Sequence, residues 1–147
     1  MVDLPKRILL DTNVFILAHL DGESPEGRIL AAISTHPSVT LILSNEIMEQ
    51  IQRVSRRVGG KDWTGLLINR VWQDFSIDFV TVSIEEKRAI EAKINIPRED
   101  IGIYITAIRG NIDCLISSNH EFVQQTAKVQ NLFETMSARA FVEKFLT

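Results

Sequence analysis

A short apolar run, Ile8 to Leu10, ends abruptly in Asp11-Thr12-Asn13 and is followed by a second apolar segment. This order of residues predicts a buried strand whose carboxyl end carries an aspartate into a turn. Ligands of open parallel sheets bind beyond the carboxyl ends of the strands, so Asp11 would lie beside such a crevice. The alternative is that Asp11 only caps the following helix, because aspartate is among the residues preferred at that position.

Apolar runs of this kind alternate with helical patterns along the whole chain. Strands are predicted at 8–10, 39–43, 78–82, 113–117 and 131–134, and helices at 14–20, 28–35, 45–58, 62–75, 83–93, 97–109, 121–126 and 137–146. The alternation favours right-handed crossovers into one sheet. We therefore expect one α/β domain over residues 1–147, with three α/β/α layers and a central, mostly parallel sheet of four or five strands.

Two of the predicted helices are separated by Gly59-Gly60, which should end the first of them. The apolar spacing predicts that one face of each helix is buried. The residues expected in the core are Ile47, Ile51, Val54 and Val58 from the first helix, and Trp63, Leu66, Leu67, Val71 and Trp72 from the second. The two tryptophans are interpreted as core residues rather than as a surface on which nucleic-acid bases stack.

The composition is that of an ordinary globular protein, with 45% apolar and 24% charged residues. The net charge of −3 argues against bulk attraction to nucleic acid but leaves room for a local basic patch. No stretch is apolar enough for a membrane span or a signal peptide, so a cytoplasmic protein without membrane association is expected. Cys114 is expected to be a buried free thiol, and Asp113 to lie at the opposite edge of the sheet from Asp11.

Acidic and amide side chains should converge where the strands end. If the first and fourth strands are neighbours, Asp11, Asp100 and Asn119 come together. Carboxylates that converge repel each other, and a hard divalent cation with oxygen ligands relieves that repulsion. Mg²⁺ or Mn²⁺ bound there could activate a water molecule and offset the charge of a phosphate, which makes phosphodiester hydrolysis the natural reaction. No glycine-rich loop follows the first strand, so a nucleotide-binding domain is disfavoured.

Three segments in this order resemble a PIN domain, and the resemblance spans nearly the whole chain. They are Leu9-Leu10-Asp11-Thr12-Asn13, the apolar helix from Asp100 to Gly110, and Ile112 to Asn119 followed by Phe122. The family includes the VapC-type toxins of bacterial toxin–antitoxin pairs, and its members are typically Mg²⁺- or Mn²⁺-dependent ribonucleases. The resemblance therefore implies RNA as substrate, an antitoxin protein as a possible partner, and a homodimer.

The resemblance also assigns roles to individual positions. Asp11 corresponds to the first metal-binding aspartate of the family and Asp100 to its third acid, while Asn119 stands where the last aspartate is usual. Ser117 matches a hydroxyl residue often found just before that position. Asp11, Asp100 and Asn119 are thus the expected metal ligands, with Ser117 and Asn13 arranging hydrogen bonds around them.

The second acid of the family is a glutamate in the helix after the second strand, and the matching position here is Gln50. Glu46 lies one helical turn earlier on the same face and is the predicted substitute, while Glu49 points about 100° away. Arg53 and Arg56 belong to a basic cluster on this helix and could contact RNA phosphates. Because two acids are replaced by amides, the alternative is a PIN-fold module that binds RNA or a protein without cleaving it.

Overall fold

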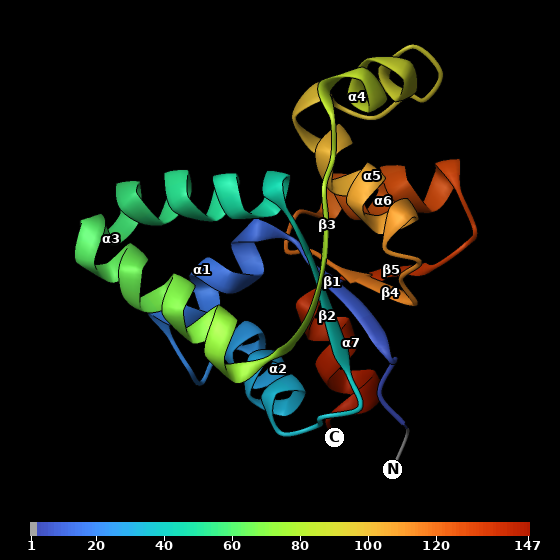
Figure 1. The fold of residues 1–147 in the computed structure, drawn as a ribbon. Coiled ribbons are helices and arrows are strands. Elements are labelled where there is room, and N and C mark those ends of the chain that lie inside the picture. Colours follow the sequence, from blue (N-terminus) through green and yellow to red (C-terminus); the bar gives the residue numbers. More distant parts are fainter. Residues whose placement is uncertain (1–2) are drawn as a thin grey trace.

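The computed structural model describes residues 3–147 and has a five-stranded sheet at its centre. All four strand pairs are parallel, and the strand order is β3-β2-β1-β4-β5 (Figure 1). The strands are β1 (Arg7–Leu10), β2 (Thr40–Ser44), β3 (Ser76–Val80), β4 (Cys114–Ile116) and β5 (Glu134–Met136). The predicted parallel α/β sheet is confirmed, and so is the expected pairing of the first strand with the fourth.

Helices cover both faces of this sheet. They are α1 (Thr12–Leu20), α2 (Pro25–Ser34), α3 (Asn45–Asp74), α4 (Ile84–Glu91), α5 (Ile101–Arg109), α6 (His120–Val129) and α7 (Ala138–Phe145), with a 3₁₀ turn η1 (Arg98–Asp100) leading into α5. The chain moves from β1 through β2 to β3 in one direction and from β4 to β5 in the other. With right-handed crossovers, the helices of the two halves lie on opposite faces. Within residues 3–147, no helix is long and apolar enough to cross a membrane.

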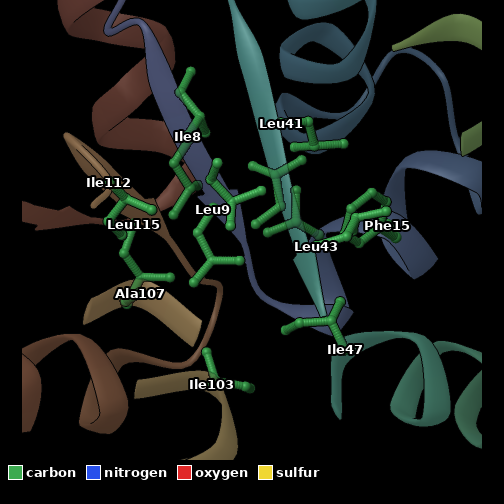
Figure 2. Packing of buried hydrophobic residues seen from close by; sticks show 14 of the residues in the cluster. Ile8, Leu9, Phe15, Leu41, Leu43, Ile47, Ile103, Ala107, Ile112 and Leu115 are labelled. Carbon is green, nitrogen blue, oxygen red and sulfur yellow. The ribbon is translucent and has the colours of Figure 1, made fainter. Parts of the chain in front are cut away.

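The core forms between the sheet and these helices because the central strands are apolar on both sides. Leu9 is fully buried and pairs with Ile42 of β2 and Leu115 of β4. Figure 2 shows Phe15 of α1 beside the β2 side chains, and Ala107 of α5 near Leu115. A strand covered on both faces reads as a continuous apolar run, which is the pattern that predicted this strand.

The segment predicted as two helices forms one hydrogen-bonded helix with a sharp kink. Gly60 adopts φ 87° and ψ 179°, a conformation that glycine accepts more readily than other residues. The prediction that the apolar residues of this segment are buried is wrong at three positions. Val58 is 48% exposed, Leu66 64% and Trp72 47%. The physical reason is that α3 is 30 residues long and only one stripe of it reaches the core.

The two ends of β4 differ in chemistry, as the sequence predicted. Asp113 precedes the strand at the amino edge of the sheet, where its carboxylate accepts a hydrogen bond from the Arg7 backbone N–H at 3.0 Å. Cys114 is a buried free thiol, and burial raises its pKa to about 12. The carboxyl ends of all five strands lie at the other edge, where Ile116 of β4 pairs with Leu10 of β1.

Candidate functional site

Asp11 is fixed by contacts to both of its oxygens. Its backbone N–H donates to the Ile116 carbonyl at 2.9 Å, which continues the pairing of β1 with β4. Oδ1 accepts from the Thr12 backbone N–H at 2.7 Å, and Oδ2 accepts from the Ser117 hydroxyl at 2.7 Å. The residue is only 6% exposed. Asp11 is therefore both the cap of α1 and a carboxylate at the crevice edge, so the two interpretations of this position hold together.

Burial raises the pKa of Asp11, and the hydrogen bonds from Ser117 and Thr12 oppose that effect. Both hydrogen bonds favour the charged form, because a carboxylate is a stronger acceptor than a neutral acid. A carboxylate held in a buried position by two donors has little freedom to move. Its remaining lone pairs are free to accept a ligand from the crevice.

The turn after β4 brings Ser117 and Asn119 to the same edge. Ser117 is fully buried, and its hydroxyl oxygen accepts from the Asn119 backbone N–H at 3.0 Å. The Asn119 side chain caps α6 by accepting from the Phe122 backbone N–H at 3.2 Å. The amide oxygen that was predicted to bind metal thus already serves as a helix cap, with one lone pair left over.

Asp100 lies at the end of η1 and is half-buried. Burial raises its pKa to about 6, and the negative charges of Asp11, Glu99 and Glu121 raise it further. Four carboxyl groups from three separate segments therefore act on one another at the carboxyl edge of the sheet. Glu99 and Glu121 were missed from the sequence, although Glu121 stands in the first turn of α6, only two residues after Asn119.

Gln50 occupies the place of an acid but acts as a bridge. Its side-chain oxygen accepts from the Thr12 hydroxyl at 2.7 Å, and its amide nitrogen donates to the Glu99 carbonyl at 3.5 Å. It therefore links the start of α1, the first half of α3 and the turn that carries Asp100. A glutamate here would keep the bond from Thr12 but lose the donor to Glu99.

The two glutamates considered as substitutes are both paired with cations. Glu46, whose side chain is 15% exposed, accepts an ion pair from Lys87 of α4 at 2.6 Å. It packs so closely on Gly102 that a Cβ there would lie 2.4 Å from its Oε1. Glu49 points to solvent and pairs with Arg53 at 3.3 Å. Sequence reasoning missed Lys87, which is far from Glu46 in the chain.

The predicted substrate-binding residues lie at different depths. Ser117 is buried beneath Asp11, whereas Asn13, Arg53 and Arg56 are exposed. Asn13 belongs to the first turn of α1, next to the site, and the two arginines project from α3. An exposed arginine paired with a glutamate one turn away, as Arg53 is, is weakly held and can exchange partners.

Among residues 3–147, no three Asp, Glu, His or Cys side chains form a complete metal site. The chemistry of the donors nevertheless fits a divalent cation. The raised pKa of Asp100 reports repulsion among carboxylates, and a hard cation with oxygen ligands removes that repulsion. Asp11 and Asp100 are the two carboxylates best placed to hold it, and Glu121 could supply the charge that Asn119 lacks.

A sequence profile described as PIN domain matches residues 7–121, most of the chain. The chain belongs to the PIN domain family. This PIN domain is also similar in fold to a chain in the crystal structure of VapBC2 from Rickettsia felis, bound to a DNA fragment from their promoter. The TM-score is 0.62 at 15% identity, and the match covers 89% of this chain and 98% of that one. No curated protein sequence matches it.

Replacing Asp100 with asparagine is expected to stabilise this PIN domain above pH 6. The folded pKa of about 6 exceeds the ordinary 3.8, so the native state loses stability as the pH rises from about 4 to 6. Asp100→Asn removes that loss, and the gain at pH 7.5 should be about 1 kcal/mol after allowance for solvent screening. Urea unfolding at pH 4.5, 6 and 7.5 with a chelator present measures it.

The matched control is Asp113→Asn, because that side chain lies at the far end of β4 from the acid cluster. A difference between Asp100→Asn and wild type that stays constant from pH 4.5 to 7.5 would show that the cluster does not repel Asp100 in the folded state.

Proposed function

We propose that the protein is a divalent-metal-dependent ribonuclease that hydrolyses RNA phosphodiester bonds. The observation that carries this proposal is the raised pKa of Asp100 beside Asp11, Glu99 and Glu121, at the carboxyl edge of a PIN domain sheet. An enzyme that cuts phosphodiesters needs concentrated oxygen ligands in a crevice that its substrate can reach. The family and the acid cluster together favour this reaction over others.

Asp11 and Asp100 would hold Mg²⁺ or Mn²⁺, with Asn119 contributing its amide oxygen or a bridging water. When bound, the cation supplies an activated water and charge neutralisation for the phosphate. The protein itself supplies orientation. Ser117 and the Thr12 backbone N–H hold the Asp11 oxygens, which fixes the direction in which the carboxylate meets a ligand.

Gln50 and Glu46 have supporting roles in this proposal. Gln50 holds the turn with Glu99 against Thr12, so it positions Asp100 relative to Asp11. Glu46 is neutralised by Lys87 and therefore adds little negative charge to the centre. Glu121 takes over as the additional acid, from the first turn of α6.

The protein would act as the toxin-like partner of a toxin–antitoxin pair. The support is the family together with the structural similarity to VapBC2. A homodimer is also proposed, since Trp72 and Phe79 stack at 6.0 Å on the surface of α3 and β3 and both are largely exposed. Light scattering on the purified protein should give the mass of a dimer, and a monomer mass would remove this part of the proposal.

The proposal is tested by adding metal and substrate to the purified protein. Calorimetric titration should show Mn²⁺ or Mg²⁺ binding to wild type that weakens at least about tenfold in Asp100→Asn. The Asp113→Asn control should bind as wild type does. Cleavage of a mixed set of structured RNAs should require the metal and stop when a chelator is added.

The alternative is a PIN-fold module that binds RNA or a protein without cleaving it. The observation in its favour is the amide of Gln50, which is fixed by Thr12 in the place of an acid. If the protein binds RNA but neither binds metal at millimolar concentration nor cleaves, the alternative replaces the ribonuclease.

A further inference from the structure

A cavity with mostly cationic walls lies between α4 and the start of α5. Its volume is about 160 Å³, and its lining residues are Ile84, Lys87, Arg88, Glu91, Arg98 and Ile101. Three of these six residues carry a positive charge and one a negative charge. We call this feature the α4 pocket. In a protein whose net charge is −3, such a concentration of positive charge is local.

The α4 pocket adjoins the acid cluster at two points. Arg98 is the first residue of η1, and Asp100 is the last residue of the same turn. Lys87 reaches the other way, to Glu46 in the first turn of α3. Figure 1 shows α4 beyond the carboxyl end of β3, on the side of the sheet where Asp11 lies. A chain crossing the acid cluster toward α4 would therefore meet this pocket.

The three cations are held to different degrees. Lys87 is anchored by its 2.6 Å ion pair with the largely buried Glu46. Arg98 is 85% exposed and meets Glu91 only at 3.5 Å, a geometry that contributes little and opens readily. Arg88 is exposed and forms no ion pair within residues 3–147. Two guanidinium groups are thus available to an anionic ligand, while the lysine stabilises the wall.

The chemistry of these walls fits a phosphodiester. Guanidinium groups bind phosphate oxygens through two parallel hydrogen bonds and are only weakly hydrated. Ile84, which is 59% exposed, and Ile101 add apolar surface against which a sugar or base can pack. The α3 cluster differs, because Arg53 is already paired and neither it nor Arg56 lines this pocket.

We propose that the α4 pocket binds a phosphate of the RNA strand next to the one that is cleaved, through Arg88 and Arg98. This inference rests on the proposed ribonuclease function and adds a path for the substrate. RNA is favoured over an acidic protein segment because the pocket adjoins the cluster where a phosphodiester would react. The strand then runs along the carboxyl edge of the sheet, from the acid cluster toward α4.

The test measures binding of a fluorescein-labelled 12-nucleotide oligouridine by anisotropy, in a chelator and in the Asp11→Asn background so that no cleavage occurs. The double variant Arg88→Ala/Arg98→Ala should weaken binding by about tenfold. It should also reduce the slope of log Kd against log salt by roughly 1.4, about 0.7 for each lost phosphate contact on a single strand. Arg88→Lys/Arg98→Lys should retain most of the slope, because the charge is kept.

The charge-matched control is Lys61→Ala/Lys128→Ala, which removes two exposed cations from the kink of α3 and the end of α6. It should leave affinity and slope within about twofold of the parent. Arg53→Ala/Arg56→Ala measures the α3 cluster in the same way. If that variant loses the slope while the α4 variant keeps it, the proposal is overturned.

An acidic 12-residue peptide serves as the competing ligand. If it binds through Arg88 and Arg98 more tightly than the RNA does, the pocket is a protein-binding site and the proposal is overturned. Failure of the ribonuclease proposal is separate. RNA binding that depends on both arginines, without metal-dependent cleavage by wild type, upholds the pocket and rejects the nuclease. Cleavage with arginine-independent binding does the opposite.

Discussion

Asp11→Asn is expected to lose metal-dependent RNA cleavage by about 10²- to 10³-fold, the range seen when a charge-stabilising group is removed from a reaction centre. The fold should survive, because asparagine has the same shape and can satisfy the same neighbours. Its oxygen can accept from the Thr12 backbone N–H, and its amide can donate to the Ser117 hydroxyl. Cleavage rates at saturating Mg²⁺ or Mn²⁺ measure the loss.

Thermal unfolding of Asp11→Asn separates the loss of chemistry from a loss of structure. Burial raises the pKa of Asp11, so the charged form is disfavoured in the folded protein and the neutral amide should not lower the melting temperature. Added metal should stabilise wild type and not the variant. If Asp11→Asn cleaves RNA at the wild-type rate, Asp11 has no part in the reaction and the ribonuclease assignment fails.

Leu9→Ala is expected to cost about 2 to 5 kcal/mol of unfolding free energy, the range for a leucine removed from a packed core. Leu9 is fully buried in the central strand, between Ile42 and Leu115 (Figure 2). The cavity would open between two helical layers and two strands, all of which are held by other contacts, so collapse around it is limited. Urea unfolding, with the denaturant slope compared between variants, measures the loss.

The matched control is Leu132→Ala, since Leu132 is 74% exposed. It should change the unfolding free energy by less than about 0.5 kcal/mol. Equal losses for the two variants would mean that the sheet centre is not packed as described.

The fold followed closely from the sequence because its signal is local. Each central strand is a short apolar run, and a run buried on both faces needs helices on both sides. The neighbours Asp11 and Ser117 were also predictable, since both follow strands that pair in parallel. Strand limits moved by a few residues: β5 begins at Glu134, where the predicted strand ended.

The acid cluster was harder to predict because its members come from segments that only the tertiary fold brings together. Glu99 and Glu121 belong to the starts of η1 and α6, and neither follows an apolar strand directly. Lys87 pairs with Glu46 across 41 positions of sequence, which no local pattern indicates. The exposed Trp72 was mistaken for a core residue because periodicity shows an apolar stripe but not how far the sheet extends to cover it.

The hydrogen-bond chain beneath Asp11 has a fixed direction. The Asn119 backbone can only donate, so the Ser117 oxygen receives that bond and its single proton is left to point at Asp11. The serine cannot reverse its role as a water molecule could. The carboxylate is consequently polarised from below at all times, and its open side always presents the same electron-rich face to whatever enters the crevice.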